Sequence, residues 1–119
     1  MAQTLFDRLG GAEGIARIVS DTIDNHLKNP LVANRFSGGD IATLKKTATD
    51  FFITGSGGPN VYKGKEMLAA HRHMNISDNE FMAVVDDVMA ALSGAGLDDG
   101  VKSEVLYIFY SLRPQVVRV

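Results

Sequence analysis

Apolar residues recur along most of this chain at the three- and four-residue spacing of an amphipathic helix. The longest such stretches cover residues 12–28, 41–53, 78–92 and 100–112. Each has an apolar stripe along one side and polar or charged residues along the other. The period of two that would indicate strands appears convincingly nowhere in the sequence. The pattern therefore predicts an all-helical fold.

Residues that favour helix starts support these boundaries. A side chain at the N-cap accepts a hydrogen bond from the first turn of its helix. Ser77 with Glu80 also matches a capping box, in which the two residues satisfy each other's backbone N–H groups. The candidate N-caps are Thr4, Asp40, Ser77, and Asp98 or Asp99.

Shorter elements and one long loop complete the chain. Short helices are expected over residues 5–9, 31–36 and 66–74. The stretch GSGGPNVYKGK at 55–65 contains four glycines and a proline, which exclude regular structure over most of its length. Strongly apolar helices on both sides argue against a domain boundary there. We expect a single domain over residues 1–119 with a frayed end at VVRV.

Composition excludes several classes of protein. The chain has 119 residues, enough for a sizeable core, and its net charge of −2 includes no basic block that would suit nucleic acid. No apolar run approaches the roughly 18 residues of a membrane span, and no signal peptide is visible. Cysteine is absent, which removes disulfides, thiolate metal sites and cysteine nucleophiles. A cytoplasmic protein is expected.

The search for catalytic motifs is negative. The sequence has no P-loop, dinucleotide fingerprint, zinc pattern or Gly-x-Ser-x-Gly elbow. Asp86 and Asp87 are adjacent and point in different directions on a helix, so they are not expected to act as an acid–base pair. A hydrolase is therefore a poor fit.

The stretch MLAAHRHMNISDNEF at 67–81 holds two of the three histidines. His71 lies four residues after Met67, so the two share one face of a helix. A single histidine framed by methionine, isoleucine and phenylalanine is what a haem iron needs on its proximal side. An ordinary buried histidine has the same surroundings. The residues alone leave both interpretations open.

A family resemblance favours the first interpretation. Its residues are LFDRLGG at 5–11, RFSGGD at 35–40, FF at 51–52, GGPNVYKGKEMLAAH at 57–71, and then Ile76 and Phe81. Together they resemble the group I truncated haemoglobins, a short branch of the globins, over essentially the whole chain. The resemblance implies a globin-like, two-over-two helical sandwich around haem b, with loop in place of much of the proximal-side helix.

The resemblance also implies roles for individual residues. His71 would be the proximal iron ligand, with its other ring N–H donated to an acceptor that fixes its orientation. Tyr62, Lys45 and Lys46 are candidates for contact with the propionates. The residues that would contact the haem are Phe36, Leu44, Ala48, Phe52, Met67, Ile76, Phe81 and Val84.

The other two histidines have different expected roles. His73 lies roughly 200° around a helix from His71, so it should face away from the iron. His26 falls near the inner stripe of its helix and is expected to be a buried hydrogen-bonding residue or an interface residue, with iron ligation as a minor alternative.

The distal side departs from the family pattern. Most members place a tyrosine where this chain has Ile23, and often a glutamine where it has Leu44, Thr47 or Ala48. A charge-assisted hydrogen bond to bound oxygen is worth roughly 1.5–3 kcal/mol, and ~1.4 kcal/mol is a factor of ten. The apolar distal pocket therefore predicts weak or fast-releasing oxygen binding, unless Thr47 or a trapped water supplies a donor.

Reversible binding of O2, CO or NO at a haem iron is the function that the resemblance implies. The alternative is a haem enzyme such as an NO dioxygenase, which would need a reductase partner and which Ile23 disfavours. A haem-free helical interaction domain is a third reading, and the joint presence of Phe36, Met67 and His71 argues against it. We expect a monomer or weak dimer.

Overall fold

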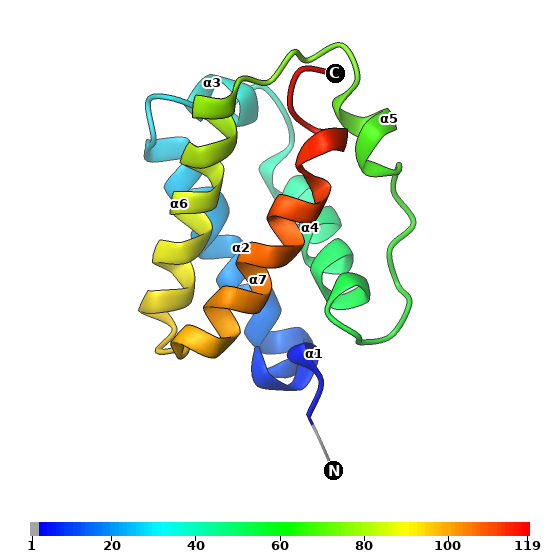
Figure 1. Ribbon diagram of the computed structural model, residues 1–119, viewed down its shortest axis with the longest axis vertical. Helices are drawn as coiled ribbons and strands as arrows, with labels where there is room; N and C mark the ends of the chain where they lie inside the picture. The colour runs from blue at the N-terminus through cyan, green and yellow to red at the C-terminus, as the bar shows by residue number, and fades with distance from the viewer. Residues whose placement is uncertain (1–2) are drawn as a thin grey trace.

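The computed structural model describes residues 3–119, and its regular structure is helical (Figure 1). The first two residues of the predicted domain lie outside the described range. Within this range no strand forms, and a single parallel bridge pairs Ile76 with Val117. The all-helical prediction is therefore confirmed. The elements are α1 (Leu5–Arg8), α2 (Gly11–Lys28), α3 (Ala33–Phe36), α4 (Ile41–Gly55), α5 (Met67–His71), α6 (Asp78–Gly94), α7 (Asp99–Leu112) and the 3₁₀ helix η1 (Arg113–Gln115).

The four long helices form two layers. Helix α2 packs against both α4 and α6, and α6 packs against α7. Figure 1 shows α6 and α7 in front of α2 and α4. This is the two-over-two sandwich that the sequence predicted. No helix within residues 3–119 is long and apolar enough to cross a membrane.

The core lies mainly between α2, α6 and α7. Its most deeply buried members include Ile15 and Leu92, at 2% and 1% exposure. Along α4 only Ile53 is buried, so Leu44, Ala48 and Phe52 pack against the core from its rim. The core residues are Leu5, Leu9, Ile15, Ile18, Val19, Ile23, Ile53, Val88, Ala91, Leu92, Val101 and Val105.

The predicted helix starts are confirmed in detail. Thr4 and Ser77 each form a capping box, and the partner of Ser77 is Glu80 as expected. Asp40 accepts a hydrogen bond from a backbone N–H of the first turn of α4. Asp98, rather than its neighbour, caps α7. These short-range hydrogen bonds satisfy N–H groups that a helix start otherwise leaves without partners.

Helix α5 is shorter than the sequence suggested. It ends at His71 instead of continuing to residue 74. Arg72 has extended backbone angles, and His73 and Asn75 have φ values of 72° and 47°. Left-handed residues cannot continue a right-handed helix. The iron ligand expected from the sequence therefore lies on the last position of the helix.

The last residues of the chain form hydrogen bonds with this segment, so the prediction of a frayed end is wrong. The N–H groups of His73 and Asn75 donate to the main-chain oxygen of Val119 at 3.1 and 3.3 Å. The N–H of Arg118 donates to the carbonyl of Ile76 at 2.9 Å. The extended chain after α5 offers backbone groups that have no helical partner, and the chain end satisfies them.

Candidate functional site

His71 is held in one orientation by its own helix. Its Nδ1 lies 2.8 Å from the carbonyl oxygen of Met67, one turn earlier. A carbonyl only accepts hydrogen bonds, so Nδ1 carries a proton, and in the neutral form of the ring the lone pair is on Nε2. The ring is half-buried, and Nε2 has no hydrogen-bond partner among residues 3–119. This arrangement suits a histidine that binds a metal through Nε2.

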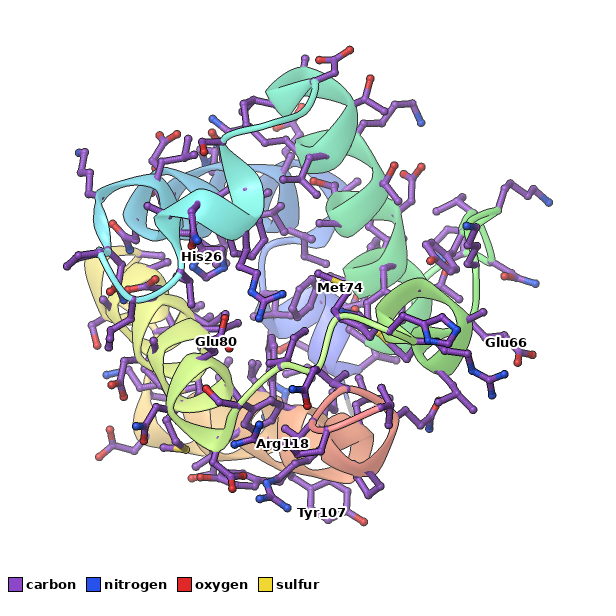
Figure 2. The ribbon with its side chains drawn as sticks, turned by 90° about the horizontal axis from the view of Figure 1, so that it is seen from above. His26, Glu66, Met74, Glu80, Tyr107 and Arg118 are labelled. Carbon is purple, nitrogen blue, oxygen red and sulfur yellow. The ribbon has the colours of Figure 1, made fainter. Side chains whose placement is uncertain are left out.

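The loop before α5 is tied to the end of α4. The N–H groups of Val61 and Tyr62 both donate to Oγ1 of Thr54 at 3.0 Å. The Tyr62 ring meets the Phe51 ring edge-on at 5.3 Å. Its hydroxyl donates to the carbonyl of Lys65 at 2.5 Å. The loop therefore starts from a fixed point at the end of α4 and leads to α5, which contacts η1 (Figures 1 and 2).

Gly64 makes the last turn of this loop possible. A Cβ at this position would lie 2.5 Å from the Tyr62 hydroxyl oxygen and 2.6 Å from the ring carbon that bears it. The tyrosine ring thus folds over a residue that must lack a side chain. The breaker-rich composition predicted a loop here, and the packing gives one of its glycines a specific reason.

The side chains expected on the distal side are nearly all hydrocarbon. Ile23 is buried at 3% exposure on α2, and Leu44 and Ala48 are half-buried on α4. Phe52 packs against Phe109 of α7 with ring centroids 5.7 Å apart. Thr47 is exposed on α4. The burial pattern fits an apolar wall built from α2 and α4.

The side chains expected on the proximal side and floor of the haem pocket come partly from α6 and the segment before it. Phe81 is buried at 4% exposure, and its ring meets that of Tyr110 at 5.8 Å. Val84 and Ile76 are half-buried. Ile76 also takes part in the bridge to Val117, so the chain end supports this side of the site.

The two lysines considered for propionate contact form ion pairs with nearby carboxylates. Lys45 donates to Asp24 at 2.8 Å and to Ser20 at 3.0 Å. Lys46 pairs with Asp50 at 2.9 Å, one turn away on the same helix.

The other histidines lie where the sequence placed them. His73 is exposed, as predicted. His26 is buried at 4% exposure, and its Nδ1 lies 2.7 Å from Asp87 Oδ2, so the prediction of a buried hydrogen-bonding residue is confirmed.

Arg35 links two parts of the site, a contact that the sequence did not predict. Its guanidinium forms two hydrogen bonds with the Glu80 carboxylate, at 2.5 and 3.0 Å. It donates a third to the carbonyl of Met74 at 3.0 Å. The Arg35 hydrogen bonds, helped by the backbone N–H of Ser77, lower the pKa of Glu80 to about 2. This contact joins α3 to the segment that crosses from α5 to α6 (Figure 2).

The interior cavity found in the core does not mark a cofactor site. Its volume is about 10 Å³, and its walls are almost entirely apolar. A space of that size holds at most a single water. It lies between α2, α6 and α7, with residues such as Ile18, Val88 and Val105 along its walls, whereas His71 lies on α5.

Comparisons with known sequences all match this chain to globins. The family model described as bacterial-like globin matches residues 4–117. A group 1 truncated haemoglobin of Tetrahymena pyriformis is 31% identical over 115 residues, which are 97% of this chain and 95% of that protein. A group 1 truncated haemoglobin of Mycolicibacterium paratuberculosis is 28% identical over 113 residues, covering 95% and 83% of the two chains.

Solved structures give the same result. The crystal structure of the T. pyriformis truncated haemoglobin in its Fe(III) form aligns with a TM-score of 0.94 at 31% identity, covering 98% of this chain and all of that one. The 2/2 haemoglobin of Synechococcus, solved with covalently attached haem, aligns with a TM-score of 0.86 at 25% identity, over 93% and 94% of the two chains. This chain therefore belongs to the bacterial-like globins and is a group 1 truncated haemoglobin.

Proposed function

We propose that this protein is a haem b globin that binds diatomic gases reversibly at an iron held by His71. The observation that carries the proposal is the hydrogen bond from His71 Nδ1 to the Met67 carbonyl, which leaves Nε2 free. When bound, haem supplies an iron that takes up O2, CO or NO. The membership of the chain in the globins supports the same reading.

The residues present fit a flat, largely apolar cofactor. Half-buried hydrocarbon side chains on α4, α5 and α6 can cover its two faces, since burying apolar surface is the main source of affinity for such a group. Tyr62, Lys45 and Lys46 are the candidates for the propionates, which would have to replace the present partners of these groups, namely the Lys65 carbonyl, Asp24 and Asp50. The residues proposed to contact the haem faces are Phe36, Leu44, Ala48, Phe52, Met67, Ile76, Phe81 and Val84.

The protein's part at the iron is to orient one neutral imidazole. The Met67 carbonyl fixes both the tautomer and the plane of the His71 ring. Because that acceptor is uncharged, it withdraws the Nδ1 proton less strongly than a carboxylate would. The ligand is therefore an ordinary neutral histidine, which suits reversible gas binding.

The distal side is proposed to select ligands by polarity and size. Ile23 offers no hydrogen-bond donor to a bound gas, and Leu44 and Ala48 offer none either. Bound O2 carries more negative charge than CO or NO, so it loses the most from an apolar wall. We therefore propose fast oxygen release.

Absorption spectra of the purified protein in the ferric, ferrous and CO-bound states test the proposal. Wild type should show a Soret band that shifts with oxidation state and with CO. His71→Ala should lose stable haem, and external imidazole should restore part of the band by replacing the missing ring.

His73→Ala is the matched control, because it removes an exposed histidine two positions away. It should leave all three spectra unchanged. A His71→Ala protein with wild-type spectra would refute the assignment of the ligand, and a wild-type protein with no Soret band would refute haem binding altogether.

A further inference from the structure

A partly buried polar cluster lies where α2 meets α6, and it is made by Asn25, His26, Asn29 and Asp87. His26 Nδ1 lies 2.7 Å from Asp87 Oδ2. Asn29 Nδ2 lies 3.3 Å from both oxygens of the same carboxylate. Asn25 Nδ2 donates to the Asp87 carbonyl at 3.1 Å. Three residues near the end of α2 thus converge on one residue of α6.

The cluster is well enclosed for an ionisable pair. The side chains of His26 and Asp87 are 5% and 13% exposed. Taking a carboxylate out of water is costly unless hydrogen-bond donors surround it. Asp87 meets this requirement with donors from His26 on α2 and from Asn29, the residue that follows α2. Such an arrangement fixes the imidazole of His26 in one orientation.

One face of that imidazole supports Phe36. The two rings are stacked, with centroids 4.6 Å apart and planes 22° from parallel. Figure 2 shows His26 between the ribbon of α3 and that of α6. Phe36 is the last residue of α3, so the stack joins the polar cluster to the end of this helix.

Helix α3 depends on such outside support. It has four residues and no side-chain hydrogen bond at its N-cap, and Ser37, Gly38 and Gly39 follow it. A helix this short does not hold its own conformation. The chain before α3 is tied to the same cluster, because Asn29 Oδ1 accepts from the N–H of Leu31 at 3.1 Å.

We infer that Asp87 and His26 are positioning residues that set the Phe36 ring against the haem. Asp87 fixes the imidazole of His26 through Nδ1, and His26 in turn fixes Phe36 by stacking. The inference rests on the proposed function, in which Phe36 contacts the cofactor. Its consequence is that side chains without any haem contact control how firmly the haem is held.

The test measures haem transfer from each CO-free ferric variant to an excess of a haem-scavenging apoglobin, together with the CO stretching band of the CO complex. Asp87→Leu removes the acceptor and should speed haem loss about fivefold, equivalent to about 1 kcal/mol for a lost aromatic stack, and broaden the CO band. Asp87→Asn keeps an oxygen that accepts from His26 Nδ1, so it should restore the wild-type rate and band width. Asp86→Leu alters the exposed neighbour and is the control.

A double variant separates positioning from stability. His26→Leu with Asp87→Leu replaces the polar pair by packed hydrocarbon, a change that often preserves the free energy of unfolding. If the double variant unfolds like wild type yet loses haem about fivefold faster, the positioning role is supported. If it is destabilised, the contrast between Asp87→Asn and Asp87→Leu decides.

Two results would overturn the inference alone. One is haem loss and a CO band in Asp87→Leu that match a haem-loaded wild type. The other is an Asp87→Asn protein as impaired as Asp87→Leu. A wild-type protein that takes up no haem is a different result, since it overturns the proposed function and this inference together.

Discussion

The helices α2 and α6 differ sharply from α4 and α5 in how they are held. Along α2 seven residues are buried and along α6 six, whereas α4 buries one and α5 none. The first pair forms a closed half of the molecule, stabilised by apolar burial at roughly 25 cal/mol per Å². The second pair forms an open half, whose apolar side chains remain partly exposed.

Within the open half, α5 is positioned by hydrogen bonds to the segments on either side of it. Thr54 holds the loop before α5, Val119 holds the chain after it, and Arg35 ties that same chain to α3. A five-residue helix cannot hold its shape alone, so these contacts decide where His71 lies. Apolar burial therefore stabilises α2 and α6, whereas hydrogen bonds position α5, which carries His71.

The largest expected effect is on the free energy of unfolding, when one leucine in each half is replaced by alanine. Leu92→Ala removes a side chain that is 1% exposed and should lower the free energy of unfolding by about 2–5 kcal/mol. Leu68→Ala on α5, where the leucine is 36% exposed, should change it by about 0.5 kcal/mol. Urea unfolding of the haem-free proteins measures both. Equal losses would erase the distinction between the halves.

The next effect concerns the proposed distal wall. Ile23→Tyr supplies a hydroxyl donor and should slow O2 dissociation roughly 10- to 100-fold, as a charge-assisted hydrogen bond predicts. Ile23→Phe adds a ring of nearly the same size without the donor, so it controls for crowding. Stopped-flow displacement of O2 by CO measures both rates. Equal rates in the two variants would show that the hydroxyl does not reach the bound gas.

A smaller effect tests the ion pair of Arg35 with Glu80, which joins α3 to the first turn of α6. The pKa of Glu80 is lowered from 4.5 to about 2, so its contribution to stability is present above pH 4.5 and is lost as pH falls towards 2. Glu80→Gln should remove this pH dependence, at a cost of up to about 1 kcal/mol at neutral pH because the pair is partly screened by solvent.

Urea midpoints measured in steps from neutral pH into this acid range show the difference. Asp86→Asn, in which an exposed carboxylate is removed from the same helix, should keep the wild-type pH profile. A Glu80→Gln protein whose stability falls with acid as steeply as wild type would contradict the role given to the pair with Arg35.

The smallest effect should come from the outer face of α4. Lys46→Gln breaks an exposed pair with Asp50 and should change the free energy of unfolding by about 0.3–0.5 kcal/mol. Haem transfer to an apoglobin, measured on the same variant, shows whether Lys46 also holds a propionate. A several-fold faster loss would add this lysine to the site, and an unchanged rate would leave it as a surface residue.

Local signals in the sequence determined the parts of the fold that depend on neighbouring residues. The helix starts at Asp40, Ser77 and Asp98 follow from side chains that reach three residues along the chain. The apolar period placed the four long helices and their inner faces. The spacing from Met67 to His71 left a haem ligand and an ordinary buried histidine both open, and the resemblance to the group I truncated haemoglobins favoured the ligand. The capping and periodic signals are readable because each acts within one or two turns of helix.

Only the tertiary structure decided the contacts between distant residues. His26 meets Asp87 across 61 positions, and Arg35 meets Glu80 across 45. The end of α5 was likewise set from afar, by the hydrogen bonds that Val119 accepts from the chain after His71. No local rule couples positions so far apart, because their meeting depends on how every intervening helix packs. The sequence therefore pointed to His71 through its family resemblance, and the packing of the whole chain determined how His71 and Phe36 are held in place.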